Sequence, residues 1–332
     1  MHSQCKLTEF TCIFCGFEMP PLCICVLRNI EDVPVKCLSI IFSTSSDNKF
    51  SSFSEEVAYI NLKDLLIICI AASENGGSLI YKVRSDNNLN KTSKGKTKEG
   101  ANDPLTNGDI YSNIIMQKTI KTLFPGIKIV SEEKNQLKDI KITNHIKSIT
   151  NIPDQIYNQN DLLIWIDPLD ATQEFTENLL DYVTTMVCVV ANGEPIIGVI
   201  HKPFQSKNNT YWAWVGKGHS PNLERTTFTD QKNVIISRSH PGEIDSSIAA
   251  IIGQDNFTVV SAGGAGYKVL EVVSGRADIY LHTTYIKKWD ICAGNAILNA
   301  LGGSMVDLKG REIQYGDQND YILKDGLKAT RS

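Results

Sequence analysis

The stretch LLIWIDPLDATQEFT, residues 162–176, is the most informative part of the sequence. Its first five residues predict a buried strand by their length and apolar content. The strand delivers Asp167 to its end, Pro168 is expected to stop it, and Asp170 follows three residues later. Two carboxylates aimed at one point repel each other unless a cation lies between them. Oxygen ligands favour Mg²⁺, Mn²⁺ or Ca²⁺ over zinc, and the Thr172 hydroxyl can orient a water molecule. The alternative is an Asp-Pro turn with a helix capped at Asp170.

Further acidic residues lie at the predicted ends of other elements. The motif SEE at residues 131–133 follows a short predicted strand, which places paired carboxylates at a second strand end. Asp290 lies at the start of one predicted helix and Asp109 at the start of another. Either residue taken alone is better explained as a helix cap than as a ligand. Four separate acidic ends in one chain are harder to explain as caps and turns, so the sequence favours a carboxylate-lined cation site.

Composition limits the class of protein. The 332 residues are 42% hydrophobic and 21% charged, which predicts a folded chain with a sizeable core. The 33 Lys and Arg residues against 37 Asp and Glu leave a net charge of −4, which excludes a broadly basic nucleic-acid binder. A weakly acidic protein can still bind an anionic small molecule, because a bound metal ion reverses the local field.

Residues 1–57 differ in character from the rest of the chain and are interpreted as a divergent, Cys-rich leader with little fold signal. Six of the nine cysteines lie in the first 37 residues, and their spacing fits no standard zinc site. An acidic residue and a Pro-Pro pair interrupt the apolar run at 10–29, so no membrane anchor is predicted there. The other three cysteines are expected to be small core residues: Cys69, Cys188 and Cys292.

The remainder of the chain divides into two predicted lobes, 58–205 and 206–332. The first begins with a helix over 58–74 and a polar loop over 85–108, and continues as strands joined by turns. The second lobe alternates short strands with helices, as α/β folds do. Its predicted helices cover residues 243–252, 266–274 and 290–301.

Four motifs together resemble the inositol monophosphatase superfamily. They are TNGD at 106–109, SEE at 131–133, WIDPLDAT at 165–172 and KWDICAG at 288–294. Five stretches make the resemblance closest to the bisphosphate nucleotidases of that superfamily: residues 167–182, residues 183–204, SRSH at 237–240, AGGAGYK at 262–268 and YIKKWD at 285–290. The resemblance covers roughly residues 58–325 and leaves the leader unmatched.

The resemblance implies an α/β fold, a layered αβαβα sandwich, and a Mg²⁺-dependent, lithium-sensitive phosphomonoesterase. The expected reaction removes the 3′-phosphate of adenosine 3′,5′-bisphosphate to give AMP and phosphate, with two or three Mg²⁺ ions and a metal-activated water. The implied metal ligands are Glu132, Asp167, Asp170, Asp290 and the carbonyl of Leu169. Asp109 and Thr172 are implied to orient and help deprotonate the attacking water.

The same resemblance implies that the second lobe completes the metal site and binds the nucleotide. Ser237 and His240 follow a predicted strand, and the glycines at 263–266 precede a helix whose N-terminal amides suit an anion. Without the resemblance, the glycines are more simply explained by tight-turn packing and His240 as an ordinary surface or core histidine. The implied substrate contacts are Ser237, His240, Gly264, Gly266 and Lys268.

Two other functions stay open on the sequence alone. One is a phosphatase of inositol phosphates with the same metal centre, and the other is an inactive family member that binds a nucleotide or a partner protein. The inactive reading is weaker, because every implied ligand and water-activating residue is present. The resemblance allows a homodimer, and it implies a small-molecule substrate and no nucleic-acid partner.

The location implied by the resemblance is the Golgi lumen, with the cytoplasm as the alternative because no anchor is predicted. Three Asn-X-Thr triplets, beginning at Asn90, Asn208 and Asn256, fit a lumenal glycoprotein. Such triplets also arise by chance, so an unglycosylated cytosolic chain is the competing explanation.

Overall fold

The computed structural model describes residues 58–96, 102–134, 149–223, 232–238 and 257–331, together with Ile248, Ile251, Gly253 and two short N-terminal strands. The chain forms two compact units, Met1–Ser54 and Glu55–Ser332. In the first unit, β1 (Cys5–Leu7) pairs antiparallel with β2 (Phe10–Cys12). His240 and most of the helix predicted over 243–252 lie outside the described residues.

A six-stranded sheet, in the order β12-β11-β10-β9-β8-β6, forms the centre of the second unit. Its strands are β6 (Lys128–Ser131), β8 (Leu162–Asp170), β9 (Thr184–Ala191), β10 (Glu194–His201), β11 (Thr210–Trp214) and β12 (Gly218–His219). Only β6 and β8 pair in parallel; the other neighbours are antiparallel. The turn at Asn192 and Gly193, both at positive φ, joins β9 to β10 as predicted. β11 and β12 follow residue 205 and belong to this sheet. The lobe boundary at residue 205 stays a prediction.

Both faces of this sheet are buried, which explains the uninterrupted apolar run that begins β8. Leu163 and Trp165 pack on one side, whereas Ile164 and Ile166 pack on the other. Alternating side chains of a strand point to opposite faces, so only a strand covered on both sides is apolar throughout.

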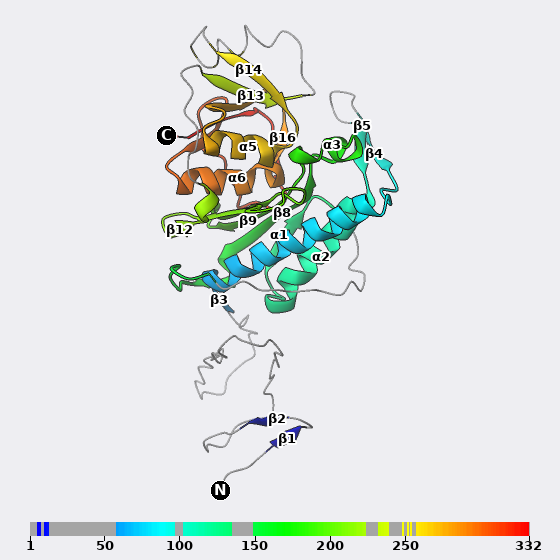
Figure 1. Ribbon diagram of the computed structural model, residues 1–332. Coiled ribbons are helices and arrows are strands. Elements are labelled where there is room, and N and C mark those ends of the chain that lie inside the picture. The colour runs from blue at the N-terminus through cyan, green and yellow to red at the C-terminus, as the bar shows by residue number, and fades with distance from the viewer. Residues whose placement is uncertain are drawn as a thin grey trace. The chain divides into compact units, whose positions relative to one another are not determined.

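Two antiparallel helices, α1 (Leu62–Ser85) and α2 (Asn107–Leu123), cover one face of the sheet (Figure 1). The helix predicted over 58–74 was too short, because α1 continues through Gly76 and Gly77. A Cβ atom at Gly76 would lie 2.5 Å from Ser112 Oγ of α2, so the glycine permits a close approach that outweighs its poor helix propensity.

A second sheet and two further helices complete the layers. The sheet, in the order β14-β13-β15-β19-β17, contains β13 (Asn233–Ser237), β14 (Thr258–Ala262), β15 (Ile279–His282), β17 (Ser304–Asp307) and β19 (Leu327–Thr330). Helices α5 (Ala265–Ser274) and α6 (Lys288–Ala300) lie between the two sheets (Figure 1). Ile248 packs against the outer face of the second sheet with Val234 and Ile236. This arrangement confirms the predicted α/β sandwich.

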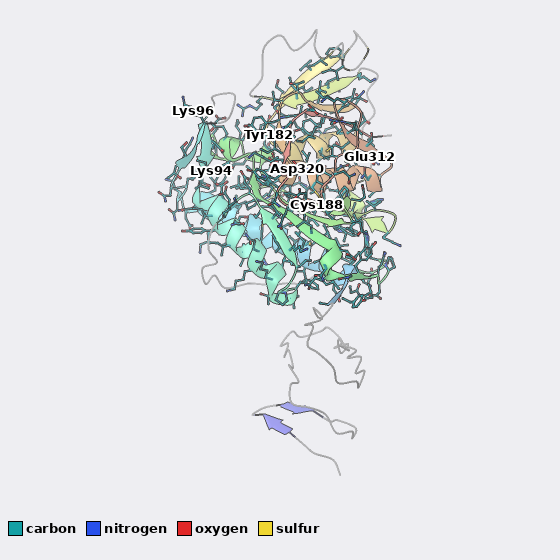
Figure 2. All side chains as sticks on the ribbon, turned by 180° about the vertical axis from the view of Figure 1, so that it is seen from behind. Lys94, Lys96, Tyr182, Cys188, Glu312 and Asp320 are labelled. Carbon is teal, nitrogen blue, oxygen red and sulfur yellow. A yellow bond between two sulfur atoms is a disulfide. The ribbon has the colours of Figure 1, made fainter. Side chains whose placement is uncertain are left out.

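Short elements surround these layers. They are β3 (Tyr59–Asn61) paired with β7 (Ile156–Asn158), β16 (Ile286–Lys287) paired with β18 (Ile322–Leu323), helix α3 (Thr172–Thr176), and the 3-10 turns Gln159–Asp161, Leu180–Tyr182 and Pro221–Leu223. The loop predicted over 85–108 was wrong in part: β4 (Thr92–Lys96) and β5 (Asn102–Leu105) form a hairpin that carries Lys94 and Lys96 (Figure 2). All five residues of β4 are exposed, so this strand lacks the apolar alternation that identifies strands.

The prediction that Pro168 ends its strand was also wrong, because β8 runs on to Asp170. The pairing with β9 shifts between Asp167 and Asp170, so two residues of β8 lie opposite one residue of β9. Such a bulge tolerates a proline, because the bulged residue needs no ladder hydrogen bond. The bulge turns the end of the strand and brings both carboxylates to one edge.

The three cysteines predicted to be small core residues are all buried: Cys69, Cys188 and Cys292. Cys69 is free. Cys188 (labelled in Figure 2) and Cys292 form a disulfide that joins β9 to α6. Sequence spacing did not reveal this pair, because 104 residues separate the two cysteines and only the packing of α6 on the sheet brings them together. Across the described residues, no helix is both long and apolar enough to cross a bilayer.

Candidate active site

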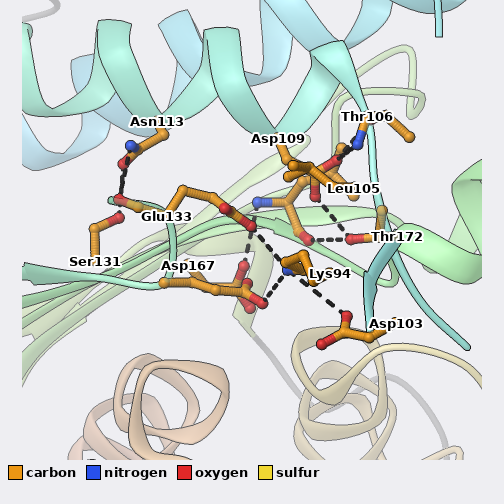
Figure 3. A network of polar contacts seen from close by, with 12 residues as sticks. Lys94, Asp103, Leu105, Thr106, Asp109, Asn113, Ser131, Glu133, Asp167 and Thr172 are labelled. Atoms are coloured by element: carbon orange, nitrogen blue, oxygen red, sulfur yellow. Dashed lines mark hydrogen bonds and ion pairs between the residues drawn. The ribbon is translucent and has the colours of Figure 1, made fainter. Parts of the chain in front are cut away.

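Asp109 and Thr172 meet at the N-terminus of α2 (Figure 3). Thr106 caps this helix: its backbone N–H and hydroxyl donate to Asp109 Oδ2 at 2.7 and 2.6 Å. The Thr172 hydroxyl lies 2.8 Å from the other oxygen, Oδ1, and 3.1 Å from the carbonyl of Leu169. Burial raises the pKa of Asp109 to about 6, although these hydrogen bonds act to lower it. The helix cap predicted at Asp109 is therefore also part of a carboxylate–hydroxyl pair.

Glu132 and Glu133 follow β6, and the Nζ atom of Lys94 lies between their carboxylates. Figure 3 shows Lys94 beside Glu133. Lys94 donates to both carboxylates at 2.8 Å and lies 3.7 Å from Asp103 on the neighbouring strand of its hairpin. Asn113 of α2 fixes the turn by donating to the Glu133 carbonyl. Burial raises the pKa of Glu132 to about 7; Lys94 lowers it, and the neighbouring carboxylates of Glu133 and Asp109 raise it further.

Asp167 is as deeply buried as Asp109, with 1% of its surface exposed. Its Oδ1 accepts a hydrogen bond from the backbone N–H of Leu169 at 3.1 Å. Burial raises its pKa well above the ordinary value, and the negative charges of Glu132, Asp170 and Asp290 raise it further. These carboxylates from β6, β8 and α6 therefore share one electrostatic environment and repel one another.

Asp170 is held by the N-terminus of α5. The backbone N–H groups of Ala265 and Gly266 donate to its two oxygens at 3.1 and 2.8 Å, and the Thr184 hydroxyl donates at 3.1 Å. The anion at this helix N-terminus is thus a side chain of the protein itself. A Cβ atom at Gly264 would lie 3.0 Å from Asp170 Oδ2, so the absence of a side chain lets the Asp170 carboxylate approach the start of α5. Gly264 also has a left-handed φ of 64°, which glycine adopts readily.

Asp290 lies in the first turn of α6 and accepts a hydrogen bond from the Lys287 backbone N–H at 3.3 Å. Burial raises its pKa well above the ordinary value, and Glu132 and Asp170 add to the rise. The same turn holds Trp289, which stacks on Tyr321. α6 therefore presents Asp290 to the edge of the sheet at which β8 presents Asp167 and Asp170.

Lys268 points inward and not toward open solvent. Only 3% of its surface is exposed, its Nζ donates to the Gly264 carbonyl at 2.6 Å, and it lies over the Tyr280 ring. Burial lowers its pKa to about 8, whereas Asp170, Glu174 and Asp290 act to raise it. In this conformation the Lys268 ammonium group supplies a buried positive charge near the carboxylates of Asp170, Glu174 and Asp290.

The other candidate substrate residues lie at the end of β13. Ser237 Oγ lies 3.2 Å from His282 Nδ1, which joins it to the end of β15. Arg238 forms ion pairs with Glu174 and Glu177 at 3.2 Å, so it links the second sheet to α3 and the residues after it. His240 lies outside the described residues.

The chemistry of this donor set fits a hard divalent cation. All its members are oxygen donors: the carboxylates of Glu132, Asp167, Asp170 and Asp290 and the Leu169 carbonyl. Buried carboxylates that repel one another need a compensating positive charge, and Lys94 and Lys268 supply part of it. As the described side chains stand, no three acidic, cysteine or histidine side chains already converge on a single point.

Sequence reasoning missed several residues of this site. Lys94 lies in a fully polar strand that gives no periodic signal, and Thr184 and Arg238 are distant from the acidic motifs in sequence. Glu133 stands within the quoted SEE motif but was given no role. For Glu133 the sequence did contain a signal, because this residue lies next to the candidate ligand Glu132 at a predicted strand end.

Comparisons with known proteins identify the family of the chain. The model of the "Inositol monophosphatase family" matches residues 61–331. "Inositol monophosphatase 3" of Xenopus tropicalis is 48% identical over 285 residues, which are 82% of this chain and 78% of the relative. "Golgi-resident adenosine 3′,5′-bisphosphate 3′-phosphatase" of Rattus norvegicus is 44% identical over 286 residues, again 82% and 78%.

Solved structures support the fold independently. The extragenic suppressor protein suhB of Bartonella henselae superposes with a TM-score of 0.60 at 19% identity and covers 81% of this chain and 94% of its own. The family match spans both sheets and every described residue of the acidic site. The chain therefore belongs to the inositol monophosphatase family, which is a family of phosphatases.

Proposed function

We propose that the chain hydrolyses the 3′-phosphate of adenosine 3′,5′-bisphosphate, releasing AMP and phosphate. The observation that carries this proposal is the buried carboxylate set beside the Asp109–Thr172 pair, because such a set has no use in a purely structural sandwich. The names of relatives at 44% identity support the bisphosphate substrate. The family is generally Mg²⁺-dependent, and the donor set of this chain fits that ion.

We assign the metal ligands to Glu132, Asp167, Asp170, Asp290 and the Leu169 carbonyl. Bound Mg²⁺ supplies positive charge that stabilises the phosphoryl and leaving oxygens and makes a water molecule more acidic. The Thr172 hydroxyl, fixed by Asp109, is placed to orient this water. As the water oxygen bonds to phosphorus, Asp109 accepts a water proton through that hydroxyl and the bond between phosphorus and the ribose O3′ breaks. O3′ takes up a proton from solvent, and no covalent phosphoenzyme forms.

The substrate side of the site is assigned to the ends of β13 and α5. We assign nucleotide contacts to Ser237 and Gly264. Further candidates are His240, which lies outside the described residues, and Gly266, whose backbone N–H also donates to Asp170. Lys268 is buried in this conformation. Its positive charge therefore acts on the substrate through Asp170, or directly once a conformational change exposes its ammonium group.

We further propose that the protein works in the Golgi lumen. Relatives named Golgi-resident support this location, and so does the Cys188–Cys292 disulfide, because structural disulfides are rare in the cytosol. A cytoplasmic protein would be expected to keep these two thiols reduced.

The decisive test is phosphate release from adenosine 3′,5′-bisphosphate, with inositol 1-phosphate assayed in parallel. We expect release that needs Mg²⁺, stops with excess EDTA and is suppressed by lithium. A chain that acts only on the inositol phosphate would favour the second candidate, which the relatives named inositol monophosphatase 3 support. A chain that is inert on both substrates but binds the nucleotide would indicate an inactive family member.

A further inference from the structure

The connection between β10 and β11 carries a triplet that the catalytic site does not use. Asn208-Asn209-Thr210 has the Asn-X-Thr pattern of an N-glycan acceptor, with no proline at the central position. Because such triplets arise by chance, the pattern alone decides nothing. Its structural setting and the redox state of the core provide two independent observations.

The Asn208 backbone is held in place while its side chain is left exposed. Gln205 and Asn222 donate their side-chain amides to the Asn208 carbonyl at 3.1 and 2.8 Å, and the residue has a left-handed φ of 51°. Within the part of the chain that the structure describes, no residue hydrogen-bonds the Asn208 side-chain amide. A sugar attached to that nitrogen would displace no protein contact.

The threonine of the triplet has a separate role in the fold. The Thr210 hydroxyl donates to Glu74 Oε1 at 2.9 Å and lies 2.9 Å from His201 Nδ1, so it links β11 to α1 and β10. Removing Thr210 would therefore disturb packing as well as the acceptor pattern. The test therefore has to substitute Asn208 and leave Thr210 unchanged.

The core supplies the second observation. The Cys188–Cys292 disulfide is typical of chains that fold in the oxidising lumen of the secretory pathway. The same lumen contains the enzymes that attach N-glycans to Asn-X-Thr triplets.

We propose that Asn208 carries an N-linked glycan. In the transfer, Asn208 Nδ2 bonds to C1 of the first sugar of a lipid-linked oligosaccharide. The bond between C1 and the diphosphate oxygen breaks, the lipid diphosphate leaves with the bonding electrons, and the amide nitrogen loses one proton to solvent. The proposal concerns modification and location, and it does not depend on the identity of the substrate.

The experiment uses the full chain produced in animal cells behind a cleavable secretion signal. Glycan release with a peptide N-glycosidase converts each modified asparagine to aspartate, and peptide mass spectrometry then locates the modified positions. The same digest, run without reduction, reports whether Cys188 and Cys292 are cross-linked. We expect the Asn208 peptide to be modified in the cross-linked protein.

Asn208→Gln and Asn209→Gln form a matched pair, because the second variant keeps the acceptor pattern. We expect the first to lose one glycan in gel mobility and the second to lose none, with phosphatase activity unchanged in both. Asn208→Asp provides an acceptor-free variant that tolerates the left-handed backbone, should the glutamine variant fold poorly. An unmodified Asn208 peptide in cross-linked protein would overturn the proposal, as would an equal mobility change in both glutamine variants.

Discussion

Asp167 and Asp170 differ in how their carboxylates are held, although they lie three residues apart. Asp167 accepts one backbone hydrogen bond, from Leu169, and is repelled by three other carboxylates. Asp170 accepts two backbone hydrogen bonds from the N-terminus of α5 and a third from the Thr184 hydroxyl of β9. Replacement by asparagine should therefore have opposite effects on stability at the two positions.

We expect Asp167→Asn to lower phosphate release by about 10²-fold or more, the scale for loss of one electrostatic stabiliser. Its free energy of unfolding should equal or exceed that of the wild type, because one charge leaves the cluster and the amide oxygen can keep the bond from Leu169. Urea denaturation without Mg²⁺ measures this. A variant that loses stability would contradict the assignment of Asp167 to a repelling cluster.

Asp170→Asn should lower activity and also destabilise the fold by about 1–3 kcal/mol, because the new amide N–H₂ faces backbone N–H groups of α5. This differs from what carboxylate repulsion alone predicts, which is an intact fold. The two asparagine variants are controls for each other in the same urea titration. Equal stability in both would argue against the α5 clamp.

Thr172 tests the water-activating pair at the residue scale. Thr172→Ala should lower kcat by about 10²- to 10⁴-fold, the usual contribution of positioned proton transfer, with a much smaller change in KM. Thr172→Ser keeps the hydroxyl and should retain most of the activity. If the serine variant is as inactive as the alanine variant, the methyl group and not the hydroxyl matters.

At the scale of elements, the disulfide fixes α6, and hence Asp290, against β9. We expect the double variant Cys188→Ala/Cys292→Ala to lose about 2–5 kcal/mol of unfolding free energy, because the cross-link closes a long loop. A thiol reductant should destabilise the wild type and leave the double variant unchanged. Cys69→Ala, at the buried free cysteine, is the control for loss of a sulfur atom alone.

At the scale of the whole molecule, the proposed cation site would link the end of β6, β8 and α6. Saturating Mg²⁺ should raise the apparent stability, by about 2.7 kcal/mol at a hundredfold excess over Kd. Thermal unfolding in Mg²⁺ and in EDTA measures this, with NaCl at equal ionic strength as the control for screening. The increment should shrink in Asp167→Asn. An equal increment from NaCl would mean that Mg²⁺ acts only by screening.

The pH dependence of stability should follow from the same carboxylates. The pKa of Asp109 is raised from 3.8 to about 6 and that of Glu132 from 4.5 to about 7, so the folded state binds more protons than the unfolded state in this range. In EDTA, stability should therefore fall as the pH rises from about 4 to about 7, and the contribution of these two residues should level off above that range. Mg²⁺ should weaken this trend, because it favours the ionised carboxylates. Urea midpoints measured across this range in each condition provide the check.

The sequence by itself determined the family and most of the elements. The acidic motifs identified Glu132, Asp167, Asp170 and Asp290 as one set, and the family model confirms the family to which they point. Apolar length and periodicity were sufficient for β8, β9, β10, α2, α5 and α6, because these elements are buried on at least one face. The roles of the individual site residues stay predictions.

Tertiary structure alone decided what depends on contacts between distant segments. α1 continues through Gly76, where it lies close to α2, and through Gly77, where it lies close to His201 of β10. The bulge lets β8 continue past Pro168, and the packing of α6 joins Cys188 to Cys292. Lys94 reaches the carboxylates from a hairpin with no apolar pattern. Local sequence signals report the burial of single elements, whereas these features depend on which elements lie against each other.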